Sequence, residues 1–92
     1  MHAVVVTASI AAGQLESSRK VLREEIVPRV SKMQGVVKGY WTASTDSAHG
    51  TSIVVFKTKE DAESAANTVR NTPPPPGVTL NTIEVREVVA ET

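Results

Sequence analysis

The order of the periodic segments constrains the fold of this chain more than any other feature. Short runs of β-branched residues alternate with stretches of helical spacing, and no spare segment separates them. The expected elements are, in chain order, a strand at Met1–Ala8, a helix at Leu15–Met33, strands at Val36–Ala43 and Thr51–Phe56, a helix at Thr58–Asn71 and a strand at Val78–Val89. The order β-α-β-β-α-β predicts an α+β fold with an antiparallel sheet, in a single domain over residues 1–92.

The first expected helix is amphipathic. Leu22 and Ile26 belong to its apolar stripe, while charged residues such as Arg19 and Arg23 are expected to lie mostly away from that stripe. Pro28 lies inside the pattern and has no backbone N–H to donate, so we expect the helix to bend or restart there.

The second expected helix has a clearer beginning and a smaller apolar face. Thr58 precedes Asp61 by three residues and is expected to cap the first turn. The apolar face consists of small residues, namely Ala62, Ala65, Ala66 and Val69. Such a face either packs close to a sheet or leaves room beside it, and we expect a cavity between it and the sheet. The prolines that follow predict an extended spacer; a proline-rich recognition motif is the alternative.

Charge and composition exclude several classes of partner. The 10 basic and 10 acidic residues cancel, and neither sign forms a block, so we expect neither nucleic acid nor a membrane as a partner. The run His49–Phe56 loosely resembles a motif of RNA-recognition modules, but Thr51 and Ile53 stand where base-stacking aromatic residues are needed.

The absence of cysteine and of a targeting signal shapes two further expectations. Without Cys there is no disulfide, thiolate nucleophile or zinc-ligand spacing, and we expect no metal and no cofactor. The amino-terminal residues do not resemble a signal peptide and no apolar run approaches ~20 residues, so the expected location is the cytoplasm.

Two of the expected strands are apolar on both faces. Val5 opposes Val4 on the first strand, and Ile53 opposes Val54 on the third. Helices would cover only one face of the sheet, and the other would leave a large apolar patch in water. A symmetric homodimer is the simplest cover, so we expect the chain to be its own partner.

Three segments carry a resemblance to a known family. The run Val4–Ala8 leading to Gly13, the step Gln34–Val36, and the run Val55–Ala62 resemble the dimeric α/β-barrel proteins of the antibiotic-biosynthesis-monooxygenase type. The resemblance implies a ferredoxin-like protomer whose sheet pairs with a second copy to form a barrel, with a pocket between sheet and helices. Members of the family include cofactor-independent oxygenases and haem-degrading enzymes.

The resemblance also places residues at the family's site positions. The haem-degrading branch carries Asn, Trp and His at positions that match Thr7, Ala66 and Pro75 of this chain, so haem degradation is not expected. Thr7 and Ala66 are retained as candidate ligand-binding positions. Phe56 matches a position that holds Trp in many relatives, and it is either a ligand contact or a core residue.

Few residues could contact a ligand or move a proton. Tyr40 and Trp41 are adjacent on a strand and must point to opposite faces, so only one of them can line a given cavity. His49 is the candidate acid or base, although a hairpin histidine is more often solvated. Two functions follow: a homodimer that binds a small hydrophobic or aromatic molecule or, as the alternative, a cofactor-independent monooxygenase acting on a phenol or quinol.

Overall fold

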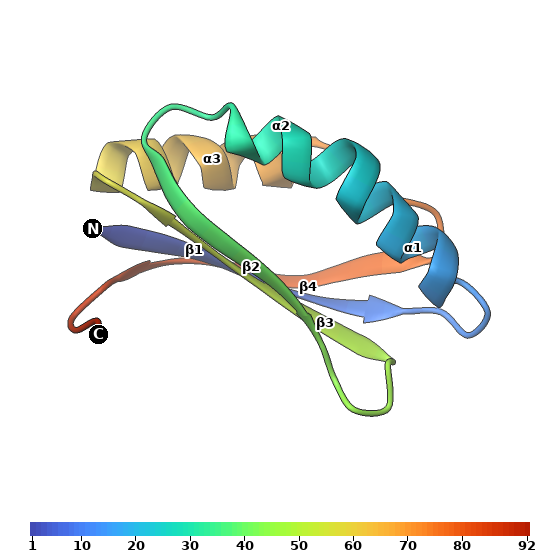
Figure 1. The fold of residues 1–92 in the computed structure, drawn as a ribbon. Coiled ribbons are helices and arrows are strands. Elements are labelled where there is room, and N and C mark those ends of the chain that lie inside the picture. The colour runs from blue at the N-terminus through green and yellow to red at the C-terminus, as the bar shows by residue number, and fades with distance from the viewer.

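A computed structural model describes all residues 1–92 and contains one four-stranded antiparallel sheet with helices on one face (Figure 1). The elements are β1 (His2–Ile10), α1 (Leu15–Val21), the π-helix η1 (Leu22–Ile26), α2 (Val27–Ser31), β2 (Val36–Ala43), β3 (His49–Phe56), α3 (Lys59–Asn71) and β4 (Val78–Glu87). The strand order is β2-β3-β1-β4, which puts β1 in the interior of the sheet. The predicted β-α-β-β-α-β order is confirmed. None of the helices is long and apolar enough to cross a lipid bilayer.

The ends of three strands differ from the prediction because pairing partners decide them. β1 continues to Ile10 and β3 begins at His49, since Ser9 pairs with His49. β4 was expected to reach Val89 but ends at Glu87, because its neighbour β1 begins at His2, which pairs with Glu87. Only one backbone hydrogen bond, from Val88 N–H to the Met1 carbonyl, continues beyond β4.

The first helical stretch is interrupted just before Pro28, and we call the whole of α1, η1 and α2 the α1–α2 segment. Within η1 the bonding widens to the π pattern, and the Val27 N–H donates to the Leu22 carbonyl. Pro28 lies in the first turn of α2, where its missing N–H costs no helical hydrogen bond. The expected restart at Pro28 therefore takes the form of a π-turn that hands over to a new α-helix.

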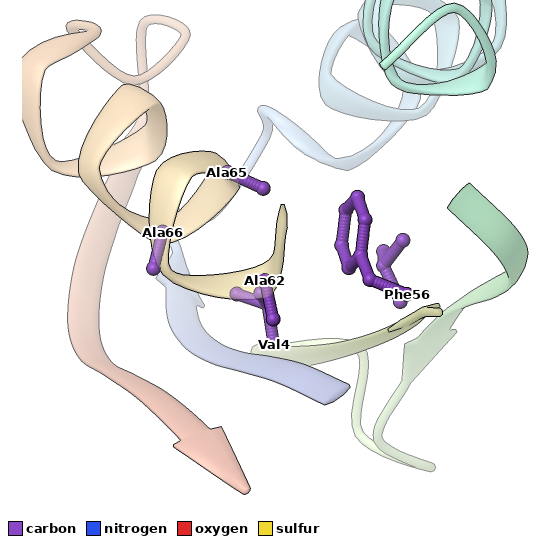
Figure 2. Close-up of a cluster of buried hydrophobic side chains, with 6 residues drawn as sticks. Val4, Phe56, Ala62, Ala65 and Ala66 are labelled. Carbon is purple, nitrogen blue, oxygen red and sulfur yellow. The ribbon is translucent and has the colours of Figure 1, made fainter. Parts of the chain in front are cut away.

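The core lies between the sheet and α3 (Figure 2). Thr58 caps α3 as predicted, and the Asp61 N–H donates to its hydroxyl at 3.1 Å. Ala62 and Ala66 are 0% exposed and Phe56 is 1% exposed, so the chain covers all three side chains almost completely. The small residues of α3 have let this helix settle directly on β1, β3 and β4.

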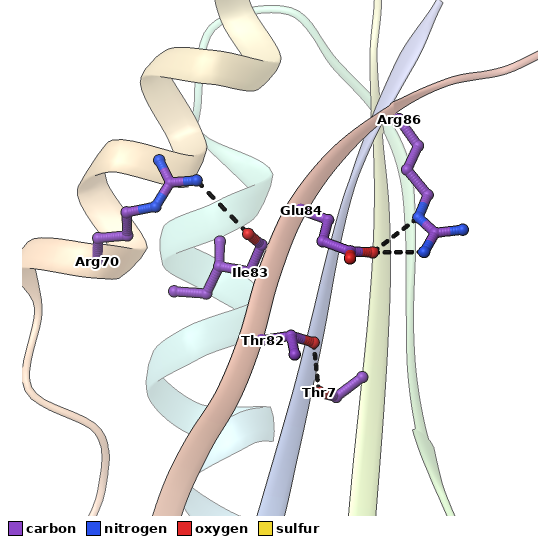
Figure 3. A network of polar contacts seen from close by, with 6 residues as sticks. All are labelled: Thr7, Arg70, Thr82, Ile83, Glu84 and Arg86. Carbon is purple, nitrogen blue, oxygen red and sulfur yellow. Dashed lines mark hydrogen bonds and ion pairs between the residues drawn. The ribbon is translucent and has the colours of Figure 1, made fainter.

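The other face of the sheet, which we call the open face, is covered by no element of the chain. It carries Ile53, 39% exposed, and Tyr40, 56% exposed, which pair across β2 and β3. Towards β4 the open face becomes polar, where the Thr7 and Thr82 hydroxyls share a hydrogen bond (Figure 3). A single copy thus leaves in water a face that is apolar towards β2 and polar towards β4.

Candidate functional site

A cavity of about 680 Å³ lies between the sheet and the α1–α2 segment. Of the 28 residues that line it, 19 are hydrophobic, so the space favours an apolar occupant over water. The roof is supplied by apolar residues of the α1–α2 segment, namely Leu15, Leu22, Ile26 and Val30, and by Met33 just after it. The floor draws on all four strands and includes Val6, Ile10, Trp41, Val54 and Leu80.

The cavity lies mainly under the first helical stretch and not, as expected, against the small face of α3. Of the four residues that form the small face of α3, Ala65 and Val69 line the cavity, whereas Ala62 and Ala66 do not. We expected the small side chains of α3 to leave a cavity, but small side chains have the opposite effect. Small side chains let a helix approach the sheet and close the gap, while the long side chains of the α1–α2 segment hold the backbone away from it.

Trp41 points to the cavity side of the sheet and Tyr40 to the open face. A Cβ atom on Gly39 would stand 3.1 Å from the Trp41 ring and 3.3 Å from Val54 Cγ2, so the absence of a side chain at Gly39 lets the indole lie over the strand. Tyr40 also borders the cavity, but its ring lies on the other face, where Lys38 Nζ is 5.6 Å from the ring centroid.

The remaining sequence candidates lie in different places. Phe56 lines the cavity and also belongs to the core beneath α3, so it joins the two regions. Ala66 is buried under α3, and Thr7 lies on the open face; neither lines the cavity. His49 is exposed at the start of β3 and outside the cavity lining.

The turn before His49 is organised around Asp46. The Ser44 hydroxyl donates to Asp46 Oδ1, and the Ala48 N–H donates to the same oxygen at 3.0 Å. These two hydrogen bonds, with a smaller contribution from His49, hold the pKa of the Asp46 carboxyl below its usual value. The Ser44 hydroxyl in turn accepts from the His49 N–H, so the polar groups here satisfy one another and build the hairpin turn.

Two cavity residues, Arg19 and Arg23, were missed by the sequence analysis, which placed them mostly away from the apolar stripe. Both line the cavity from the α1–α2 segment. The signal was in the spacing: Arg19 follows Leu15 by four residues, and Arg23 precedes Ile26 by three. Long arginine side chains can lie along an apolar surface while the guanidinium stays near water, which is why charge alone misled the prediction.

The other polar regions of the molecule have no comparable apolar lining. No group of His, Asp or Glu side chains is arranged to hold a metal ion. A hollow of about 670 Å³ lies between α3 and β4, but it is lined mainly by charged residues of both signs. There Arg70 Nη2 lies 3.5 Å from the Ile83 carbonyl, and Arg86 Nε donates to Glu84 at 2.9 Å (Figure 3). These groups satisfy one another on the surface.

Comparison with known proteins identifies the fold. No protein-family profile and no curated protein sequence matches the chain. Among solved structures it is similar to a mutant of MhuD with two manganese protoporphyrin IX bound per active site, with a TM-score of 0.78 and 13% identity over 100% of this chain and 98% of that one. It is also similar to a dimeric ferredoxin-like protein from an uncultured marine organism, with a TM-score of 0.68 and 12% identity over 100% and 98% of the two chains.

A third similar structure is a monooxygenase from the gene ActVA-Orf6 of Streptomyces coelicolor in complex with nanaomycin D. Its TM-score is 0.57 at 10% identity, and the match covers 99% of this chain and 92% of that one. The chain therefore has the ferredoxin-like α+β fold that the sequence predicted, and it shares this fold with these structures. At these identities the likeness establishes the fold alone.

Proposed function

We propose that this protein is a homodimer that binds a small hydrophobic or aromatic molecule in the cavity under the α1–α2 segment. The observation that carries the proposal is the cavity itself, which has a volume of about 680 Å³, is lined mainly by apolar side chains and lies on the sheet face that the helices cover. Ligand pockets typically occupy ~300–1,000 Å³ and combine an apolar lining with a few polar groups.

The aromatic residues of the lining favour a flat ligand. The Trp41 ring lies over Gly39 on the floor, and Phe56 stands at the boundary with the α3 core. Aromatic rings attract other rings in stacked or edge-on arrangements, beyond the area that they bury. Two such rings at one cavity support an aromatic or polycyclic compound over a flexible aliphatic chain.

The homodimer is supported by the open face. Ile53 and Tyr40 are exposed on its β2–β3 side, and a second copy would bury both symmetrically. The structurally similar protein from a marine organism is described as dimeric. We further propose that the tail beyond β4, where Val89 is 87% exposed, reaches the partner subunit.

Sedimentation equilibrium tests the dimer. At micromolar concentration we expect twice the chain mass, and we expect removal of residues 88–92 to weaken association. A stable monomer at that concentration would contradict the homodimer, and unchanged association after truncation would show that the tail makes no intersubunit contact.

Binding is proposed ahead of turnover because of the ionisable groups at the cavity. A cofactor-independent monooxygenase acting on a phenol or quinol needs a proton acceptor beside the substrate. The ionisable side chains bordering the cavity are Arg19, Arg23 and Tyr40, and the Tyr40 ring lies on the open face. Guanidinium groups remain protonated and cannot accept that proton, so this lining supports a binding protein.

A neutral fluorescent probe tests the ligand cavity. Trp41 is the only tryptophan, so its emission reports from the cavity floor. We expect N-phenylnaphthylamine to bind once per chain and to quench Trp41 by energy transfer. Ala65→Phe should place a ring inside the cavity and weaken binding, whereas Ala12→Phe, on an exposed loop residue, should leave binding unchanged. Absence of saturable binding, or equal binding by both variants, would refute the cavity site.

A further inference from the structure

We infer that the ligand is an aromatic anion, with its ring system in the cavity and its acidic group held by Arg19 and Arg23 on the helical side. This inference rests on the proposed binding function and names the class of ligand. A carboxylate and a sulfonate present the same chemistry here, namely a negative charge spread over oxygens that accept from a guanidinium.

The charge of the lining has one sign. Arg19 in α1 and Arg23 in η1 are the only charged side chains among the residues that line the cavity. An apolar space with two cations at its border and no carboxylate favours a ligand that is apolar over most of its surface and negative at one end.

Neither arginine is neutralised within the chain. The ion pairs of the structure are Lys59 with Glu63 and Arg86 with Glu84, both remote from the α1–α2 segment. Glu24 and Glu25 share that segment but are neither paired with the arginines nor part of the lining. The two guanidinium groups are therefore free to bind an external anion and to donate hydrogen bonds to it.

Their spacing adds a physical reason for a shared ligand. Residues four apart on a helix are neighbours, and two like charges there repel by about 0.2–0.5 kcal/mol. A single anion between Arg19 and Arg23 would convert that repulsion into two attractive contacts. Each guanidinium can offer two parallel N–H donors to one acidic group, which a lysine ammonium cannot do.

The π-turn contributes to this arrangement. Arg23 lies within η1, between Leu22 and Ile26, and all three line the cavity. A π-turn widens the helix by one residue per turn and is frequent at functional sites. In this protein it carries a cation between two apolar roof residues.

A matched pair of probes tests the inference. Anilinonaphthalene sulfonate and N-phenylnaphthylamine share the same aromatic body, and only the first carries an anionic group. We expect Arg19→Gln and Arg23→Gln each to weaken binding of the sulfonate probe about fivefold to tenfold, in the range of partly exposed charge-assisted hydrogen bonds. Binding of the neutral probe should stay within about twofold, which also shows that each variant keeps its cavity.

Lys20→Gln is the matched control, because it removes the same charge from an exposed residue of α1 that does not line the cavity. It should change neither affinity by more than about twofold if the local contact and not the net charge is decisive. In the unmodified protein, about 1 M salt should weaken binding of the sulfonate probe but not of the neutral probe, since charges separated by more than ~3 Å are then screened.

The outcomes separate the inference from the proposed function. If neither probe binds the unmodified protein, the ligand cavity is refuted. If both bind, but the double variant Arg19→Gln/Arg23→Gln and high salt leave the sulfonate affinity unchanged, the cavity stands and the anionic ligand is overturned. If Lys20→Gln weakens the sulfonate probe as much as either arginine variant, the anion site is likewise overturned.

Discussion

α3 and the α1–α2 segment cover the same face of one sheet, yet α3 packs closely on the sheet at Ala62 and Ala66, whereas the α1–α2 segment stands over a cavity. Under α3, Ala62 and Ala66 are completely buried. Under the α1–α2 segment, about 680 Å³ remains open beneath Leu22 and Ile26. The difference shows that large side chains do not by themselves fill an interior: they also set how far apart two layers stand.

This comparison assigns different tasks to the two halves. The α3 side supplies most of the close packing, and Phe56 anchors it from the sheet (Figure 2). The α1–α2 side contributes a looser layer that can accept a ligand. Apolar surface lining an empty cavity lacks dispersion contacts on one side, so its stabilisation is incomplete until a ligand binds.

The largest expected effect comes from removing the side chain that joins the two regions. Phe56→Ala should lower the free energy of unfolding by about 3–5 kcal/mol, because a nearly fully buried ring leaves a void beside α3. Leu22→Ala, in the cavity roof, should cost about 1 kcal/mol, since its side chain already faces open space. Urea denaturation measures both. Equal losses would mean that the two regions are packed alike.

A smaller effect separates two adjacent residues of α3. Ala66→Phe should overpack the core and cost about 1–3 kcal/mol, because Ala66 is 0% exposed and lies outside the cavity. Ala65→Phe should cost less, since the new ring can extend into the cavity that Ala65 lines. Thermal midpoints of the two variants give the comparison. A greater loss for Ala65→Phe would show that the cavity does not extend to α3.

The smallest expected effect on stability concerns the hairpin turn at Asp46. This turn lies outside both helical regions, so it gives a reference for changes that affect neither of them. Its pKa is lowered in the folded protein by the Ser44 hydroxyl and the Ala48 amide, so its contribution to stability is present above the ordinary value of 3.8 and is lost as the pH falls below it. Asp46→Asn should make the turn less sensitive to acid. The pH dependence of the NMR signals of the Ala48 and His49 amides measures this. Titration of Asp46 at or above 3.8 would contradict this account.

Much of the fold was predictable from local pattern. The helical start at Thr58 depends on one hydroxyl and an amide three residues on, which the sequence displays directly. Because Tyr40 and Trp41 are adjacent on a strand, their side chains had to point to opposite faces of the sheet. Which of the two faces the cavity depended on where the helices pack. Strand ends were less predictable, because Glu87 ends β4 only through the position of His2 on the neighbouring strand.

The candidate site was predictable in composition and not in position. The aromatic candidates Trp41 and Phe56 line the cavity, whereas Thr7 and Ala66, taken from family positions, lie elsewhere. Arg23 was missed although it precedes Ile26 by three residues, because a charged side chain was expected to point away from the apolar stripe.

By itself, the sequence determined the type and order of the elements and which residues within each element share a face, because these depend on periodicity and local hydrogen bonding. The tertiary structure decided how far each helix stands from the sheet, which face of the sheet the helices cover, and hence that the cavity lies beneath Leu22 and not beneath Ala66. Those distances result from contacts summed over residues far apart in the chain, and no local pattern contains them.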